Sequence, residues 1–218
     1  LGENGTFGRK SYKEILLTRY FREALLRLNP WLTPAQMDEA QRAMERRLST
    51  ASLLQVNEEK YSLIRDGIPV TVKKPGGKTE TQRAAVMDFQ HPDNNHFLAV
   101  KELKIHAESG IYRKRTDIVG FVNGIPLVFM EFKRNTVDVQ DAYTQNYADY
   151  QDSIPQLFYY NAFLILSNGT EAKIGTLGSK YEFFHEWKRL SEQEEGRVAL
   201  ETMLRGVCKK ENLLDLFE

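Results

Sequence analysis

The sequence predicts an α/β sandwich with a mixed sheet, and three observations lead to that class. Strand-like segments fill the middle of the chain, apolar residues at helical spacing precede them, and further helix and strand patterns follow. The segment Leu127–Met130 is apolar at both parities, as expected of a central strand covered by helices on both faces. The 218 residues, 41% of them hydrophobic, suffice for one well-buried core.

Two helices are predicted near the start of the chain. Apolar residues recur every three or four positions over residues 11–28, and an Asn-Pro pair ends that helix. Thr33-Pro34 supplies an N-cap and a first-turn proline for a second helix over residues 35–47. The Gln, Glu and Arg residues of the second segment predict a solvated face.

Strand patterns begin at about residue 67. Residues 68–72 and 79–87 flank a Lys-Lys-Pro-Gly-Gly-Lys segment and predict a β-hairpin. Three further strand segments follow, and the Asn-Gly pair between the last two is the strongest hairpin signal in the sequence. These three segments are residues 97–105, 112–122 and 125–132.

The remaining elements complete the sandwich. Residues 137–151 predict a helix, and residues 162–167 predict an apolar strand that an Asn-Gly turn joins to a shorter one. From about residue 187 the chain is charged and helix-friendly, with few turn residues. We therefore predict one α/β domain over residues 1–190 and a helical extension over residues 191–218.

Composition excludes several classes of function. Thirty basic and thirty acidic residues give zero net charge, so any surface for nucleic acid or an acidic membrane must be local. The single Cys208 excludes a disulfide framework and a thiolate zinc site. No apolar run is long enough to span a bilayer, and the first residues lack the apolar core of a secretory signal. We expect a cytoplasmic protein with no membrane partner.

One glycine-rich segment needs a separate interpretation. Gly76-Gly77-Lys78-Thr79 is similar to the end of a phosphate-binding loop, but the first glycine of such a loop would fall at Val72, in a predicted strand. A hairpin turn is therefore the better interpretation. We expect no ATP hydrolysis from this chain alone.

Two carboxylates and an amine are predicted to converge at one end of the Asn-Gly hairpin. Asp117 lies six residues before the turn and Glu131 seven after it, so the two lie nearly opposite each other across the ladder. Because side chains alternate along a strand, Glu131 and Lys133 point to the same face and Phe132 to the other. The three charged groups can therefore share one space.

This arrangement suits hydrolysis of a phosphodiester. Two carboxylates and a backbone carbonyl can hold Mg²⁺, which neutralises a phosphate and acidifies a bound water. A lysine beside them can orient that water and stabilise developing charge. The alternative is an ordinary ion pair between Glu131 and Lys133, and on spacing alone that alternative is the more frequent one.

The segment that carries these residues resembles a known nuclease family. It reads Asp117-Ile-Val-Gly-Phe-Val-Asn-Gly-Ile-Pro-Leu-Val-Phe-Met-Glu131-Phe-Lys133. It closely resembles the nuclease domain at the N-terminus of the restriction (R) subunit of type I restriction-modification enzymes, a PD-(D/E)xK fold. The resemblance covers about residues 10–190 and includes Arg27-Leu-Asn-Pro-Trp-Leu-Thr, Asp88-Phe-Gln-His-Pro-Asp-Asn-Asn-His-Phe-Leu-Ala-Val and Ile154-Pro-Gln-Leu-Phe-Tyr-Tyr-Asn-Ala-Phe-Leu-Ile-Leu-Ser-Asn-Gly-Thr-Glu-Ala.

The resemblance implies a role for each member of the constellation. Asp117 and Glu131 would be the metal-binding acids, with the Phe132 carbonyl as a further ligand, and Lys133 would be the lysine of the motif. The ion would be Mg²⁺, with Mn²⁺ as a substitute. The implied fold is a mixed central sheet flanked by helices, with N-terminal helices and a C-terminal helical extension.

The family also carries Gln-x-x-x-Tyr on the helix after the motif, and this chain departs from it. Gln145 is in place, but Tyr150 lies five residues on rather than four, and Asn146 has the four-residue spacing instead. One extra helical residue turns a side chain by about 100°. We nevertheless assign the motif to Gln145 and Tyr150, and we assign Tyr143 and Tyr147 to packing.

Positive charge precedes the first acid of the site. Arg113-Lys114-Arg115, with Lys101 and Lys104 on the neighbouring strand, is predicted to contact DNA phosphates at the mouth of the site. A solvated edge strand explains the same charges about equally well.

The resemblance implies a Mg²⁺-dependent endonuclease domain that cleaves double-stranded DNA. It further implies a full-length subunit that uses ATP to translocate DNA and that joins methyltransferase and specificity subunits. Two alternatives stay open: an inert DNA clamp or assembly module of the same fold, and a stand-alone repair nuclease. A clamp would bind DNA equally with and without Mg²⁺, and helicase motifs downstream in the gene would dismiss the stand-alone nuclease.

Overall fold

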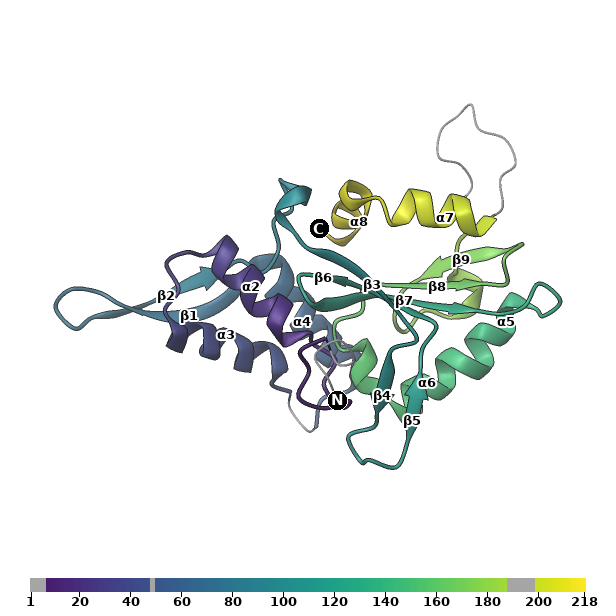
Figure 1. Cartoon of the computed structure of the whole chain (residues 1–218), viewed down its shortest axis with the longest axis horizontal. Coiled ribbons are helices and arrows are strands. Elements are labelled where there is room, and N and C mark those ends of the chain that lie inside the picture. Colours follow the sequence, from purple (N-terminus) through teal and green to yellow (C-terminus); the bar gives the residue numbers. More distant parts are fainter. Residues whose placement is uncertain (1–6, 48–49, 188–198) are drawn as a thin grey trace.

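The framework of the chain is a five-stranded mixed sheet, seen in a computed structural model that describes residues 7–47, 50–187 and 199–218 (Figure 1). The strand order is β3-β6-β7-β8-β9, and every pair is antiparallel except β7–β8. The predicted α/β class with a mixed sheet is confirmed. The strands are β3 Phe97–Lys101, β6 Ile118–Val122, β7 Ile125–Phe132, β8 Phe163–Ser167 and β9 Ala172–Gly175.

Helices cover both faces of this sheet, so each face has its own apolar core (Figure 1). Strand β7 is buried along nearly its whole length, which confirms the prediction of a central strand covered on both sides. The first core takes side chains from α2 Thr18–Leu28, α3 Pro34–Glu45, α4 Leu53–Asp66, α7 Ala199–Val207 and α8 Lys210–Phe217. The second lies under one run of helix, α5 Val139–Asp141, the π-helical turn η2 Ala142–Tyr147 and α6 Ala148–Ser153, and under the 3-10 turn η3 Pro155–Phe158.

The helix predicted over residues 11–28 begins only at Thr18. Residues before it are held by other partners: the carbonyl of Tyr12 accepts a hydrogen bond from His106 N at 3.0 Å, and Leu17 N donates to Gly124 O at 2.9 Å. The prediction of helix for the first part of this range is therefore wrong. The second helix is confirmed, and Thr33 caps it through a capping box with Gln36.

The strand patterns of residues 97–105 and 112–122 are each divided in the structure. Their outer parts, β4 Lys104–His106 and β5 Arg113–Arg115, pair only with each other in a separate ladder. The break lies at Glu102, whose φ of 54° is in the left-handed region, and Glu102 N donates to Asp117 O at 2.8 Å. A left-handed residue turns the strand out of the sheet, so the prediction of two continuous strands is wrong.

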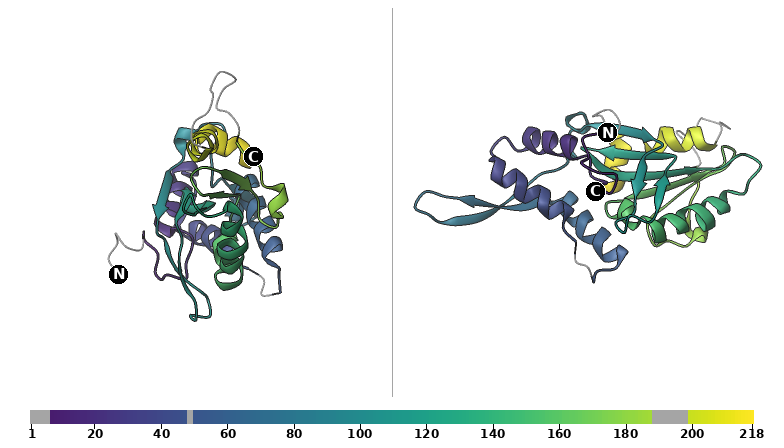
Figure 2. Two further views of the ribbon diagram at one scale, coloured as in Figure 1. Left: turned by 90° about the vertical axis from the view of Figure 1, so that its right-hand side faces the viewer. Right: turned by 60° about the horizontal axis from the view of Figure 1, so that its bottom comes forward.

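The predicted hairpin around the Pro-Gly break is present. Strands β1 Ile68–Lys73 and β2 Thr79–Ala84 pair with each other and not with the central sheet. We call residues 68–84 the arm, because the hairpin projects from the body at one end of the long axis (Figures 1 and 2). The segment Gly76-Gly77-Lys78-Thr79 lies at its turn, as the hairpin interpretation predicts.

The predicted C-terminal extension forms two helices, α7 and α8, over most of its described residues. Helices α7 and α8 contribute Met203, Val207 and Leu214 to the first core, packed on the sheet and visible along its upper side in Figure 1. Residues 191–198 of the predicted extension lie outside the described residues. None of the helices in the described ranges combines the length and the apolar character needed to cross a membrane.

Candidate active site

One extra residue in strand β7 brings Asp117 and Glu131 opposite each other. Near the turn Phe121 pairs with Pro126, but beyond the irregularity Gly120 pairs with Val128, so Leu127 is a bulged residue. Its carbonyl accepts hydrogen bonds from Ala162 N at 2.8 Å and from Asn161 Nδ2 at 3.2 Å, so the backbone oxygen of the bulged residue is not left without a partner.

The shifted register sets the geometry of the site. Ile118 pairs with Met130, so the next step along both strands places Asp117 across from Glu131. Without the bulge, Glu131 would face Thr116, and its side chain would point to the other face of the sheet from that of Asp117. The predicted convergence of the two carboxylates therefore holds, and the bulge is its cause.

Asp117 is fixed on both its backbone and its side chain. Its carbonyl accepts from Glu102 N at the bend between β3 and β4, and its Oδ2 accepts from Phe132 N at 2.8 Å. Because the N–H and C=O of one strand residue point to the same neighbour, the Phe132 carbonyl also turns toward the Asp117 side. Lys133 N donates to Ser167 O on the opposite side at 2.8 Å.

Glu131 is a buried carboxyl with one unsatisfied oxygen. Its residue is 3% exposed, and Oε2 has no hydrogen-bond partner among the described residues. Burial, and then the charge of Asp117, raise the pKa of Glu131 from 4.5 to about 7, against the opposing effects of Asn146 and Lys133. The site thus holds two carboxyls in a space that disfavours two negative charges.

Asn146 joins the acid to the amine. Its Nδ2 donates to Glu131 Oε1 and its Oδ1 accepts from Lys133 Nζ. Glu131 and Lys133 are therefore linked through an amide rather than by the direct ion pair that spacing alone favours. Asn146 was noted in the sequence only for its four-residue spacing to Tyr150, and that spacing is the signal that identifies it.

The π-helical turn η2 accounts for this exchange of residues. It spans Ala142–Tyr147 and leads into α6, which carries Tyr150. A π-turn accommodates one extra residue within a helix. Asn146, and not Gln145, therefore lies on the same side as Tyr150, facing the sheet. Gln145 is exposed and is not brought to the acids. Its predicted role stays a prediction without a contact to support it.

Tyr150 lies beside the site as predicted. It is buried, its hydroxyl donates to Arg115 O at 3.1 Å, and its ring meets Phe129 edge to face. Burial, with the nearby acids Glu131 and Asp117, raises the pKa of Tyr150, so its phenol stays neutral. Tyr143 and Tyr147 pack in the second core, as predicted.

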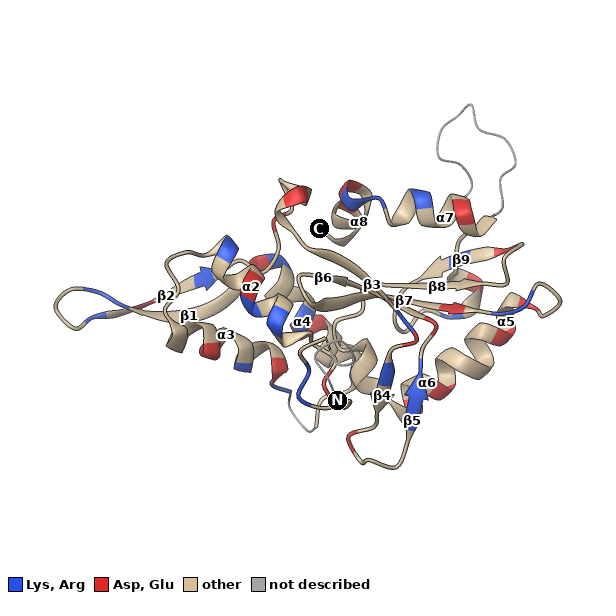
Figure 3. Ribbon diagram, in the orientation of Figure 1, with Lys and Arg blue, Asp and Glu red and all other residues tan. Residues whose placement is uncertain are grey.

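The basic residues of β5 flank the site on two faces. Arg113 and Arg115 are exposed, and Arg115 lies 3.7 Å from Glu102. Lys114 points to the other face, where Nζ lies 2.6 Å from Asp149 of α6. Figure 3 shows the basic positions of β4 and β5 beside α6. The predicted basic strand thus lies next to the site, and two of its three charges, those of Lys114 and Arg115, already have an acidic partner.

The donor set fits a hard divalent cation. Among the described residues, no group of three or more His, Cys, Asp or Glu side chains could hold a metal. Mg²⁺ is commonly held by one or two carboxylates with water completing its shell. Asp117, the unsatisfied Oε2 of Glu131 and the Phe132 carbonyl match that requirement, and a cation would offset the burial and the Asp117 repulsion that raise the Glu131 pKa.

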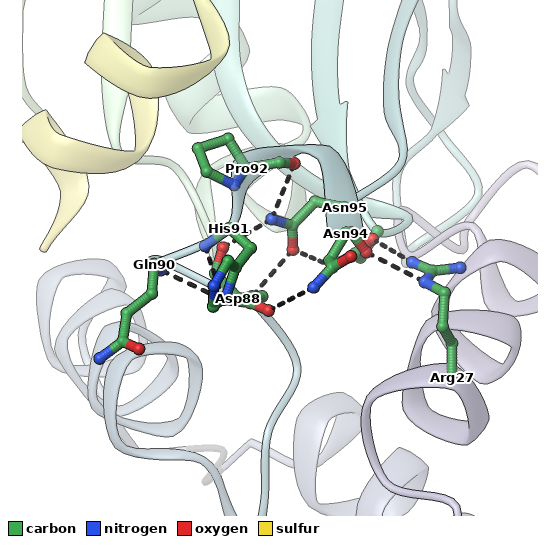
Figure 4. Close-up of polar contacts among 8 residues, drawn as sticks. Arg27, Asp88, Gln90, His91, Pro92, Asn94 and Asn95 are labelled. Atoms are coloured by element: carbon green, nitrogen blue, oxygen red, sulfur yellow. Dashed lines mark hydrogen bonds and ion pairs between the residues drawn. The ribbon is translucent and has the colours of Figure 1, made fainter.

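The opposite end of the same hairpin is closed by a polar network. Asn123 is fully buried, and its side chain accepts from Arg27 and His96 N and donates to Val86 O and Asn95 Oδ1. Asp88 fixes the neighbouring loop by accepting from the backbone N–H groups of two residues and from Asn94 Nδ2 (Figure 4).

These contacts explain two of the four stretches that carry the resemblance. The stretch beginning at Arg27 meets the stretch beginning at Asp88 where Arg27 Nε donates to Asn94 O at 3.0 Å (Figure 4). Both then bond to the Asn-Gly turn. Their role in the structure is to hold the turn of β6 and β7, at the other end of the hairpin from Asp117 and Glu131.

Comparison with known proteins gives a consistent result. Residues 2–183 match the family described as type I restriction enzyme R protein N terminus. The chain is 33% identical over 97% of its length to the type I restriction enzyme HindI endonuclease subunit of Haemophilus influenzae, of which the match covers 20%. It is 27% identical over 96% of its length to the putative type I restriction enzyme MjaIXP endonuclease subunit of Methanocaldococcus jannaschii, of which the match covers 22%. The chain thus spans about a fifth of the length of these relatives.

Proposed function

The chain belongs to the family of type I restriction enzyme R protein N-termini, and from this premise we propose that it is the metal-dependent DNA endonuclease domain of such a subunit. The fold is then of the PD-(D/E)xK class. The observation that carries the proposal is the position of Asp117, one step beyond the Ile118–Met130 pair and so across from Glu131, whose buried Oε2 has no partner among the described residues. Two acids this close do not stabilise each other, but together they can hold a cation.

The proposed metal ligands are Asp117, Glu131 and the Phe132 carbonyl. Bound Mg²⁺, or Mn²⁺ in its place, would supply charge neutralisation at the phosphate and a more acidic water. The bond from Phe132 N holds Asp117 in position, and the bond from Asn146 holds Glu131. The protein thereby fixes both carboxylates before substrate arrives, which is the usual requirement for an efficient site.

Lys133 is proposed to orient the attacking water and to stabilise charge on the phosphate. Its Nζ donates to Asn146, which holds the ammonium near the two acids. Asn146 is therefore a positioning residue in the place that the sequence pattern gave to Gln145. Tyr150 supports the site by fixing the backbone of β5 through Arg115 O.

The substrate is proposed to be double-stranded DNA. Arg113 and Arg115 are exposed beside the site, where their charges can contact phosphates on either side of the cleaved bond. ATP-driven translocation and assembly with methyltransferase and specificity subunits are proposals for the full-length protein. We place that protein in the cytoplasm, where restriction of DNA takes place.

Calorimetric titration of Mn²⁺ into the chain tests the metal site directly. We expect one saturable site that Asp117→Ala and Glu131→Ala both abolish. Glu80→Ala is the matched control, because it removes an exposed carboxyl from the arm, and it should bind Mn²⁺ as the parent does. Retention of the site in Asp117→Ala would overturn the assignment and favour the inert clamp, which needs no metal to bind DNA.

A second titration tests Asn146 against its neighbour. Groups that orient metal ligands are worth about 10- to 100-fold in metal affinity, so Asn146→Ala should weaken Mn²⁺ binding by that factor. Because the Asn146 hydrogen bond lowers the Glu131 pKa, the pH at which Mn²⁺ binds should also move upward. Gln145→Ala should leave the Mn²⁺ affinity within about twofold of the parent value and the pH of binding unchanged, since Gln145 is exposed. Equal effects of the two variants would contradict the role of Asn146.

Cleavage is tested in the full-length subunit assembled with its partners. Removal of one group that stabilises developing charge typically costs about 10²- to 10³-fold in rate. Lys133→Ala should therefore slow cleavage by at least about 10²-fold. Lys209→Ala removes one exposed lysine outside both the site and the arm, and it is the control for charge alone. Full cleavage by Lys133→Ala would show that the lysine has no catalytic role.

A further inference from the structure

The arm is a part of the described chain that the proposed active site does not use. Nothing lies within 4 Å of where a side chain would start at Gly76 or Gly77, so the tip is free of the body. Figures 1 and 2 show it extending away from the rest of the molecule. The helices α5 and α6, which adjoin the active site, lie at the opposite end of the long axis (Figure 1).

The base of the arm is firmly attached. Ile68, Val70 and Ala84 are buried in the first core. On α3, Gln36 Nε2 donates to Thr71 O at 2.8 Å, and the Glu39 carboxylate accepts from the Thr71 hydroxyl at 3.0 Å. An isolated two-stranded hairpin is only marginally stable. These contacts therefore hold the arm extended.

The arm carries a local excess of positive charge. Three lysines and Arg83 against the single acid Glu80 give residues 68–84 a net charge of +3, whereas the whole chain has none. Figure 3 shows these positions near the tip and along β2. Apart from the buried Ala84, every residue of β2 is exposed and polar. The arm has no large exposed apolar side chain, so its surface suits a polyanion better than an apolar protein groove.

We propose that the arm is a second DNA contact, which holds the duplex by its phosphates at a distance from the active site. The proposal rests on the proposed function in DNA cleavage. The major groove of DNA, about 12 Å wide, admits a two-stranded β-ribbon, and lysines neutralise phosphates on its edges. Because we assign the lysines of the arm to phosphates and not to base edges, the proposed contact is independent of sequence. A duplex that touches both arm and site lies along the long axis.

The dependence of DNA affinity on salt tests the arm. Fluorescence anisotropy with a duplex of about 30 base pairs is measured for the whole chain and for Lys73→Gln/Lys78→Gln, with a metal chelator present. Each lost phosphate contact lowers the slope of log K against log salt by about 0.9, so the double variant should lower it by about 2. Two duplexes of unrelated sequence should give the same change.

The matched control removes two exposed lysines from other surfaces. Lys10→Gln/Lys209→Gln has the same change in net charge, and its slope should stay within about 0.5 of the parent value. If the arm variant and this control change the slope equally, the arm is not a DNA contact. If the arm variant keeps the parent slope but the full-length subunit no longer assembles with its partners, the arm is a protein contact, and the proposal is overturned.

Two further readouts separate this proposal from the proposed function. The arm variant should bind Mn²⁺ as the parent does, and adding the arm substitutions to Asp117→Ala should lower the slope in chelator by the same amount as adding them to the parent. If the parent binds no duplex at all, the role in DNA cleavage fails together with the arm. If the parent binds duplex and the arm variant binds it with the parent slope, the arm proposal alone fails.

Discussion

The chain contains two β-hairpins of similar plan with opposite surroundings. In the β6–β7 hairpin nearly every residue of β7 is buried, whereas in the arm nearly every residue of β2 is exposed. A side chain at Gly124 would start 2.5 Å from Leu17 O, but one at Gly76 would meet nothing within 4 Å. The same local motif therefore serves once as a rigid support for buried carboxyls and once as a charged projection. The difference lies in what packs around each hairpin.

The largest difference between the two hairpins is expected from substitution of their turn glycines. Both Gly124 and Gly76 have positive φ, 77° and 86°, and alanine in that region costs about 1–2 kcal/mol. Gly124→Ala must also displace the backbone of Leu17 and Phe21. We expect it to lower the free energy of unfolding by about 3 kcal/mol or more, and Gly76→Ala by no more than about 2 kcal/mol. Urea denaturation of both variants measures the difference, and equal losses would mean that the close approach at Gly124 has no energetic consequence.

The second test concerns the buried carboxyl that the β6–β7 hairpin supports. In metal-free chain the folded pKa of Glu131 is about 7 against 4.5. A raised carboxyl pKa contributes stability that is present in full below about pH 4.5 and lost as the pH rises through 7. The difference in free energy of unfolding between Glu131→Gln and the parent should therefore grow by about 2–3 kcal/mol between pH 4.5 and 8.

Chemical denaturation across that pH range, with a chelator present, measures this growth. Glu80→Gln is the matched variant, because it removes an exposed carboxyl from the arm. A Glu131→Gln curve that runs parallel to the parent curve at every pH would contradict a raised Glu131 pKa. Adding Mn²⁺ at pH 8 should restore part of the parent's lost stability, because the cation binds the charged form.

The smallest effect is expected in the arm itself. Lys74 and Glu80 form an exposed pair at 2.6 Å, and such pairs contribute little to stability because water screens them. Lys74→Ala should change the free energy of unfolding by less than about 0.5 kcal/mol. Thermal and urea unfolding that showed a loss above about 1 kcal/mol would give the charges of the arm a structural role, and the contrast between the two hairpins would weaken.

The sequence predicted the main elements of the site because its signals are local. The Asn-Gly pair fixes the turn of β6 and β7, and the distance of Asp117 and Glu131 from that turn places them close together. The bulge at Leu127 has no local signature of its own. It is fixed by the carbonyl contacts of Leu127 with Ala162 and Asn161, which are distant in sequence.

Other features depended on tertiary structure in the same way. The division of the outer strands at Glu102 follows from its backbone bond to Asp117. The choice of Asn146 over Gln145 follows from a π-turn, whose hydrogen bonds leave no compositional trace. The late start of α2 follows from the bond of His106 N to Tyr12 O. At Glu102 and at the start of α2 a contact between separate segments overrode a local periodicity, and at Asn146 the π-turn did so.

The bulge at Leu127 also makes the site sensitive to whether an insertion is odd or even. Removal or addition of one residue between the turn and Glu131 would transfer its carboxyl to the other face of the sheet, while burial and composition would change little. Two residues would restore the face. Among chains of this kind, a functional hairpin should therefore vary in length by pairs of residues, or carry a second irregularity that compensates for the first. The requirement on this strand is that the number of residues between the turn and Glu131 stays odd or stays even, and the exact number matters less.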